Sequence, residues 1–419
     1  MLESLKNALK VSELRTKLLY TLGMIFIFRL GAHIPIPGVN ADKFAELVNS
    51  GLIFGFFDVI SGGALKNFAV FAMGITPYIN ASIILQLLTV VIPHLEKLAK
   101  EGEEGRKKIT QYTRYLTVVL AFIQGLGMVV GVRGSLYNPG ILTYIITALT
   151  ITAGTTFLMW LGEQITEKGI GNGISLLIFA GIVSRVPAGA ARLFEYLNAG
   201  TINILSLVAL VVIGVLVIAG VVAIQEGQRR IPVQYAKRVV GRRIYGGQTT
   251  HLPLRVNQAG VMPIIFASSL LMFPETIARW FSSSAPSVFY VKYFGWATPA
   301  HTIVYALLII GFTFFYTAVV MNPTDVADNI KKYGGFIPGL RPGRPTAEYI
   351  SRIMNKTTMA GAVFLALIAI LPNFVLLATR IPNIYFGGTA LLIVVGVALD
   401  TMKQVESHLL MRSYQGFIK

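Results

Sequence analysis

The chain contains no cysteine and has few charged residues. Of its 419 residues, 13% are charged and 54% are hydrophobic, and the mean hydropathy is +0.67. Without cysteine, disulfides and thiolate metal sites are excluded. So apolar a composition at this length is typical of an integral membrane protein. The charges that occur are mostly basic, with 36 Lys and Arg against 19 Asp and Glu, which gives a formal net charge of +17.

Catalytic and nucleotide-binding signatures are also missing from the sequence. The histidines are scattered without metal-ligand spacing, and neither an HExxH motif nor a Gly-Lys-Ser/Thr phosphate loop occurs. The run 169–173 lacks the third glycine of a dinucleotide fingerprint and is better explained as a tight turn between two spans. Glu163, Glu275 and Asp400, the acidic residues nearest the apolar runs, lie toward the run ends, which argues against an ion-coupled transporter. We therefore predict no enzymatic activity, no cofactor and no metal site.

Ten charge-free intervals are candidates for membrane-spanning helices. They are 18–28 (extended past Arg29), 67–95, 115–132, 134–162, 169–184, 196–225, 256–274, 293–324, 357–379 and 381–399. A spanning helix needs about 20 apolar residues, and long basic side chains at the ends of a short interval can reach the membrane surface. We expect Arg29 to do so, because it lies close to the outer end of the first span. The sequence thus predicts ten transmembrane helices with both termini on one side.

The basic residues predict which side that is. Of the 36 Lys and Arg, 27 lie on the side of the termini, eight lie in the opposite loops, and Arg29 lies within the first span. Because cytoplasmic loops are enriched in Lys and Arg, both termini are predicted to be cytoplasmic. Residues 1–17 then form a short amphipathic cytoplasmic segment without a signal-peptide cleavage site, and 404–419 form a cytoplasmic tail. Such a basic surface suits anionic phospholipid, RNA or an acidic protein face.

Two of the predicted cytoplasmic loops, about 225–257 and 322–356, are unusually long and rich in Gly, Pro and Arg. That density of Gly and Pro predicts fixed turns rather than helices. A basic loop can simply set the orientation in the membrane. Two such loops with more basic charge than orientation needs favour a docking surface.

The stretch from Gly55 to Val91 consists of two dissimilar pieces. The first, 55–66, is apolar but too short to cross a membrane, and Gly62-Gly63 would interrupt a helix. The second, 68–91, is long enough to span and carries polar residues along its length. Irregular backbone within a membrane survives only where protein or a water-filled cavity surrounds it. This arrangement suggests a cavity or pore wall with the short piece inside it, although a surface loop before an ordinary helix also fits.

Eight stretches of the sequence resemble the SecY family of protein-conducting channels, in the same order. They are 28–38 (FRLGAHIPIPG), 61–65 (SGGAL), 74–79 (GITPYI), 102–115, 157–166 (FLMWLGEQIT), 169–175 (GIGNGIS), 250–257 (THLPLRVN) and 337–343 (IPGLRPG). The resemblance covers essentially the whole chain. It implies an all-α integral membrane protein with ten transmembrane helices in two inverted five-helix halves, 18–187 and 188–403, around an hourglass pore with a plug.

The resemblance also implies a pore ring of apolar residues. By motif these fall on six isoleucines: Ile75 and Ile79 in the second span, Ile174 and Ile178 in the fifth, Ile265 in the seventh and Ile393 in the tenth. Residues spaced i, i+4 lie on one helix face. Branched apolar side chains can close around an extended chain, and an apolar constriction gates by dewetting. Ordinary core packing is the alternative for any single isoleucine.

Three further sets of residues are implied by the resemblance. The plug, about 55–67, seals the outer funnel at rest and contains Phe57, Asp58, Val59, Ile60, Ser61, Gly62, Gly63, Ala64 and Leu65. Gln86 and Asn257 lie near a lateral gate formed by the second and third spans against the seventh and eighth. Arg242, Arg243 and Arg341 match arginines where the SecA ATPase or a ribosome docks. Arginine suits such positions because its fork binds carboxylate or phosphate through two hydrogen bonds.

Two functions from different classes are open at this point. The resemblance implies the central channel subunit of the Sec translocon in the bacterial cytoplasmic membrane, passing unfolded secretory proteins across and membrane proteins laterally into lipid. The implied partners are SecE, SecG, SecA, the ribosome, signal peptides and nascent or unfolded polypeptides, with no DNA. The alternative is a ten-span inverted-repeat secondary transporter of a small solute, which would need a polar site at mid-membrane.

Overall fold

Each predicted span contains one long helix. The computed structural model describes residues 11–40, 44, 58, 61–200, 202–235, 238–240, 243–245, 249–280, 293–295, 298–379 and 388–416. The helices that fall in the ten predicted spans are α2 (Ser12–Gly31), α5 (Thr76–Val91), α7 (Glu103–Gly131), α8 (Ile141–Lys168), α9 (Gly173–Asn198), α10 (Ile204–Glu226), α11 (Met262–Trp280), α13 (Pro299–Val320), α15 (Arg344–Thr379) and α16 (Gly388–Gly416). Most of the predicted N-terminal segment, 1–10, and the end of the tail, 417–419, lie outside the described residues.

Six of the described helices are long and apolar enough to cross a membrane, namely α7, α8, α9, α10, α13 and α15. Helix α5 qualifies only together with α6 (Pro93–Lys100), against which it is bent by 101°. Helix α2 carries Arg15, Lys17 and Arg29 within its 20 residues, and the apolar part of α11 is the shorter stretch Met262–Leu271. Length and hydropathy therefore identify a multi-pass membrane protein, in which some spans are broken or partly charged.

The second span is shorter than its charge-free interval. We predicted one span over 67–95, but residues 67–75 form turns and α5 begins only at Thr76. Pro77 lies in the first turn of α5, where its missing N–H leaves no helical hydrogen bond unmade. Pro93 likewise begins α6 after the bend. Before α5, Ile36 and Val70 donate backbone hydrogen bonds that join the chain after α2 to the chain at 68–70.

The two long loops form a β-sheet and a helix, which corrects the prediction of turns. Strands β1 (Gln228–Tyr235) and β4 (Thr249–Arg255) of the first loop pair antiparallel, and β5 (Gly335–Phe336) of the second loop adds to β1. Strands β2 (Arg238–Val240) and β3 (Arg243–Tyr245) form a separate hairpin. The second loop also holds α14 (Pro323–Lys332) and the first turns of α15.

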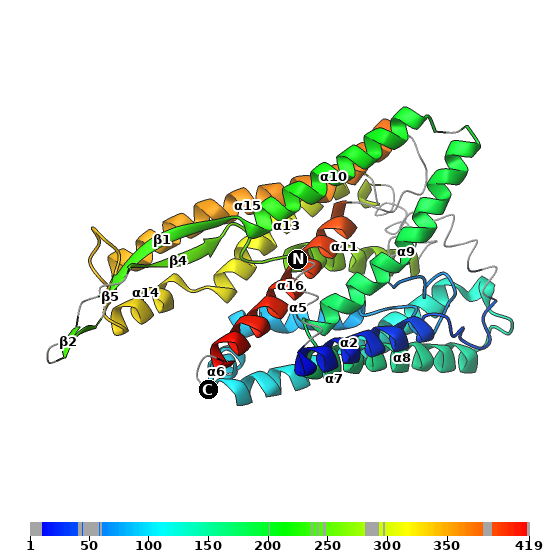
Figure 1. The fold of residues 1–419 in the computed structure, drawn as a ribbon. Helices are drawn as coiled ribbons and strands as arrows, with labels where there is room; N and C mark the ends of the chain where they lie inside the picture. The colour runs from blue at the N-terminus through cyan, green and yellow to red at the C-terminus, as the bar shows by residue number, and fades with distance from the viewer. Residues whose placement is uncertain are drawn as a thin grey trace.

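A shared apolar core joins the two loops. It consists of Ile231, Val233, Leu254, Ile330, Ile337 and Ile350, all buried. Alternate residues of β1 face this core, while Arg229 and Arg230 are exposed. Figure 1 shows this body, built from the sheet, α14 and the start of α15, projecting from one end of the helical bundle. Two loops far apart in sequence therefore present one surface.

The helices on either side of the predicted midpoint of the chain are in contact. Helix α11 packs against α5 and α7, and α16 packs against α9. The largest apolar cluster draws residues from α2, α5, α8, α9, α10, α11, α13, α15 and α16. In Figure 1, α2, α7 and α8 lie on one side of the bundle and α10 and α15 on the other.

Candidate functional site

The six predicted ring isoleucines come together from four helices. Ile75 immediately precedes α5 and Ile79 lies within it; Ile174 and Ile178 lie in α9, Ile265 in α11 and Ile393 in α16. All except Ile174 are buried, and Ile174 is half-buried. Five of them are members of the largest apolar cluster, and Ile174 packs against it. That cluster also holds many residues that no motif selects, so the ring itself stays a prediction.

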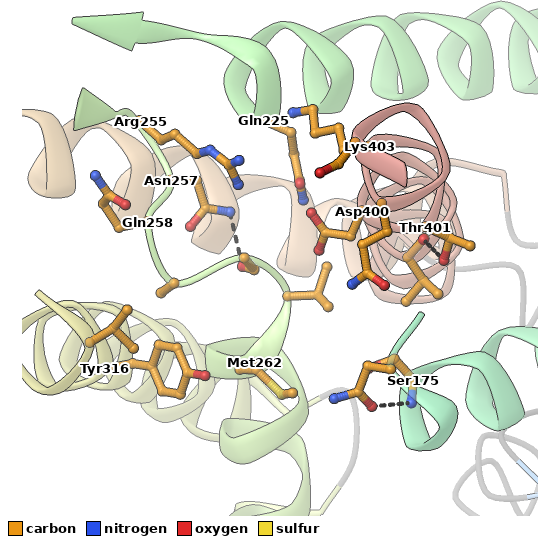
Figure 2. Close-up of a pocket in the computed structure, with 18 residues that line it drawn as sticks. Ser175, Gln225, Arg255, Asn257, Gln258, Met262, Tyr316, Asp400, Thr401 and Lys403 are labelled. Carbon is orange, nitrogen blue, oxygen red and sulfur yellow. Dashed lines mark hydrogen bonds between the residues drawn. The ribbon is translucent and has the colours of Figure 1, made fainter. Parts of the chain in front are cut away.

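A polar cavity adjoins the ring residues at one end. It has a volume of about 470 Å³ and lies among the N-terminal ends of α9 and α11, the C-terminal ends of α10 and α13, and the middle of α16. Figure 2 shows Ser175, Gln225, Arg255, Asn257, Tyr316, Asp400, Thr401 and Lys403 among its lining residues. Ser175, Met262 and Val397 line it within one helical turn of Ile178, Ile265 and Ile393, respectively. The cavity therefore lies next to the predicted ring.

The described part of the predicted plug is Asp58 and residues 61–67; Phe57, Val59 and Ile60 lie outside the described residues. Asp58 and Ser61 to Leu65 are all buried. The segment turns on itself, because Gly63 donates its N–H to the Asp58 carbonyl at 2.8 Å and Ala69 donates to the Ala64 carbonyl at 2.8 Å. Ala64 joins the largest cluster, whereas Leu65 packs in a second cluster with residues of α7 and α8.

Two arginines hold this segment from neighbouring helices. Arg29 of α2 donates from Nη1 to the Gly62 carbonyl at 2.6 Å and to the Ser184 hydroxyl of α9 at 3.0 Å. Arg185 of α9 forms an ion pair with Asp58. We expected Arg29 to reach for the membrane surface; instead, its guanidinium binds protein oxygen atoms inside the bundle.

The two predicted lateral-gate residues are not joined by a hydrogen bond. Asn257 donates from Nδ2 to the Gly260 carbonyl at 2.9 Å, and it lines the cavity. In the described part of the chain, its Oδ1 and the Oε1 of Gln86 are both buried without a hydrogen-bond partner. Helix α11, one of the four predicted gate helices, contacts both α5 and α7.

Two of the three predicted docking arginines lie in described parts of the two long loops. Arg243 begins β3, where it pairs with Val240, and Arg341 is exposed in the turn between β5 and α15. Its carbonyl accepts a hydrogen bond from the Thr346 hydroxyl at 2.8 Å. Arg242 lies outside the described residues. Among the described residues no group of three or more His, Asp and Glu could hold a metal ion.

Comparison with known proteins decides the family. The SecY family model matches residues 69–402. The chain belongs to the SecY family. It is 51% identical to the protein translocase subunit SecY of Halalkalibacterium halodurans over the full length of both chains.

Solved SecY-family channels share the fold over most of the chain. One is a SecY channel whose plug domain is described as stabilising the closed state and maintaining a membrane seal; it has a TM-score of 0.68 and 19% identity, and covers 94% of this chain and 92% of its own. Another is Sec61 in the canine ribosome-channel complex from the endoplasmic reticulum, with a TM-score of 0.61, 19% identity and the same shares covered.

Membership of the SecY family settles the class of protein. The chain has the ten-helix SecY channel fold and is the channel subunit of a protein translocase, not an enzyme. It is a multi-pass membrane protein, and SecY-family channels work with ribosomes. The comparisons do not favour the small-solute transporter.

The sequence missed three features of the site. Arg185 lies in no motif, and its position directly after the interval 169–184 gives no sign of an acidic partner. The cavity arises from five helices and could not be found from any one of them. The third missed feature is strand β1, half of whose residues are polar. The alternation of Ile231 and Val233 with exposed neighbours was the signal that could have predicted it.

Proposed function

We propose that unfolded secretory chains pass through this subunit between its six ring isoleucines, and that membrane segments leave sideways between α5 and α7 on one side and α11 and α13 on the other. The membrane is the bacterial cytoplasmic membrane, with both termini in the cytoplasm. Residues 18–187 and 188–403 form the two halves of the channel. The chain itself supplies no energy, and SecA or a translating ribosome drives transport.

The observation that carries this proposal is the position of the cavity beside the predicted ring. Three helices contribute residues both to the ring and to the cavity within one helical turn. A polar vestibule leading to a narrow apolar constriction lets an extended chain enter while an empty pore dewets and stays closed to ions. The isoleucines can part around side chains of any kind, because dispersion contacts are not directional.

The two-loop body supports the docking part of the proposal. Because β5 of the second loop adds to the sheet of the first, the two loops form one folded unit, with Arg341 after β5 and Arg243 on the separate β2–β3 hairpin that lies between β1 and β4 in the sequence. A rigid basic surface is suited to bind an acidic protein face or ribosomal RNA, and the same basic charge suits anionic phospholipid. We assign SecA and the ribosome to this surface. SecE and SecG are proposed as companion subunits, and signal peptides as ligands of the lateral gate.

The proposal is tested by crosslinking a stalled precursor. The chain has no cysteine, so Ile79→Cys introduces a unique thiol. Val208→Cys is the matched control, because Val208 is 54% exposed on α10, the most apolar of the spanning helices. A secretory precursor with one cysteine is stalled in membranes that contain SecE and SecA. We expect a disulfide with Ile79→Cys and none with Val208→Cys. Failure to crosslink at Ile79 or the other ring positions in folded, SecA-bound protein would overturn the ring.

A further inference from the structure

A small cluster of charges surrounds the Gly62-Gly63 turn inside the bundle. Asp58 is 8% exposed, and its Oδ1 accepts the N–H of Lys66 at 2.7 Å while its other oxygen pairs with Arg185. In the described part of the chain, the Nε of Arg185 is buried and has no hydrogen-bond partner. The buried carboxylate of Asp58 is therefore paired with the guanidinium of Arg185, whose side chain is 24% exposed.

The glycines let both arginines approach the turn closely. Gly62 and Gly63 have φ values of +66° and +93°. A Cβ on Gly62 would lie 3.0 Å from Arg29 Nη1 and from the Cα of Gly181, and a Cβ on Gly63 would lie 2.7 Å from Arg185 Nη2. The guanidinium groups thus occupy the space that side chains would fill. The turn thus lies against α2 and α9, and a larger residue at either position would have to displace these groups.

We propose that Arg29 and Arg185 are positioning residues that form a latch on the plug, and that separation of Asp58 from Arg185 is the event that frees it. This inference rests on the proposed function, because it presumes that the segment is a plug. Removing one partner of a buried ion pair leaves an uncompensated buried charge. The seated plug is therefore favoured as long as the pair is intact, and a chain entering the pore must separate the two groups.

The contacts differ in what they contribute. The hydrogen bond from Arg29 is accepted by a backbone carbonyl, that of Gly62, so it does not depend on the side chains of the plug. The Arg185 pair depends on a single side chain, Asp58. We therefore expect neutralisation of Asp58 to release the plug, even though Asp58→Asn keeps an oxygen that can accept the Lys66 N–H.

The test measures how fast a reporter cysteine in the plug is labelled. Ser61→Cys is nearly isosteric, and Ser61 is buried in the seated segment. Right-side-out membrane vesicles containing the full-length translocase are treated with a membrane-impermeant maleimide. Asp58→Asn and Arg185→Gln should each raise the labelling rate roughly tenfold or more. Arg133→Gln is the matched control, since Arg133 is an exposed arginine of η1 (Arg133–Ser135) outside the cluster, and it should leave the rate unchanged.

Two further variants distinguish a latch from simple damage to the fold. The double variant Asp58→Asn, Arg185→Gln leaves no unpaired charge, so it should label more slowly than either single variant. Arg185→Lys keeps the cation and should label more slowly than Arg185→Gln. Two results would contradict the ion-pair latch. One is a double variant in which the effects of the two single substitutions on the labelling rate simply combine, and the other is an equal labelling rate for Arg185→Lys and Arg185→Gln.

The outcome also separates this inference from the proposed function. If all latch variants label as slowly as the parent while the Ile79→Cys crosslink forms, the latch is wrong and the channel assignment stands. If the crosslink at Ile79→Cys also fails to form, both the ring assignment and the plug assignment are wrong. Fast labelling of Ser61→Cys in the otherwise unchanged chain would also overturn the latch, because the resting plug would not be held.

Discussion

Replacement of Gly63 by alanine should displace the plug without altering any charge. Gly63 has a φ of +93°, in the left-handed region, and a Cβ there would lie 2.7 Å from Arg185 Nη2 and 2.8 Å from its Cζ. An ordinary van der Waals contact begins at 3.4 Å. Moving the guanidinium back to this distance shifts it from its position beside Asp58.

The free energy by which Gly63→Ala disfavours the seated plug has two parts, one from the backbone conformation and one from the close contact with Arg185. A residue with a Cβ loses about 1–2 kcal/mol in the left-handed conformation. An added methyl group in a tightly packed site costs about 1–3 kcal/mol. Together they disfavour the seated plug by about 2–5 kcal/mol. Even the lower value shifts the equilibrium toward the displaced plug by roughly 30-fold.

The assay is iodide efflux from vesicles that carry the full translocase with no substrate bound. Gly63→Ala should raise the leak, because the outer seal is displaced while the ring alone remains. Gly102→Ala is the control: Gly102 has a φ of +84°, but nothing lies within 4 Å of its added Cβ, and it lies between α6 and α7, far along the chain from the plug. Vesicles with folded Gly63→Ala that are as tight as the parent would refute the reasoning.

Three other substitutions have defined outcomes. Ile350→Ala should destabilise the two-loop body by about 2–5 kcal/mol, because Ile350 of α15 is fully buried in the core that both loops share. Limited proteolysis should then cut residues 225–257 faster. An unchanged cleavage rate would contradict a shared core. Gln86→Leu removes a buried oxygen that has no hydrogen-bond partner in the described chain, so it should stabilise the closed channel by about 1–3 kcal/mol. The unfolding temperature should rise and translocation should slow. A lower unfolding temperature would contradict this prediction. Glu163→Gln breaks the 2.8 Å pair with Arg114, whose side chain is 49% exposed, so the loss should be only about 0.2–1 kcal/mol. In high salt, the unfolding temperatures of Glu163→Gln and the parent should become equal. A difference that persists in high salt would mean that Glu163 does not stabilise the protein through an exposed ion pair.

Family membership and the spans could be predicted from the sequence because both depend on local properties. A charge-free run is apolar wherever the chain carries it, so each of the ten intervals contains a helix in the structure. The order of the motifs predicted the SecY family, and the family model confirms it. The assignment of individual ring, gate and docking residues remains a prediction, since it rests on motif position alone.

The site depends on contacts between residues distant in sequence, and these required the tertiary structure. Arg29 and Gly62 are 33 positions apart and Asp58 and Arg185 are 127 apart. Nothing in the local sequence of either arginine indicates a carbonyl or carboxylate partner, so the membrane surface was the reasonable expectation for Arg29. The sheet escaped prediction for the same reason, because β1 is completed by β5 from another loop.

The sequence by itself determined the class of protein, its family and which apolar runs hold a helix, because burial in a membrane selects apolar residues one run at a time. Only the tertiary structure decided what holds the plug and what joins the two loops. Ion pairs and strand pairs form between whichever groups the helices bring within reach, and that proximity is a property of the packed bundle rather than of any single segment.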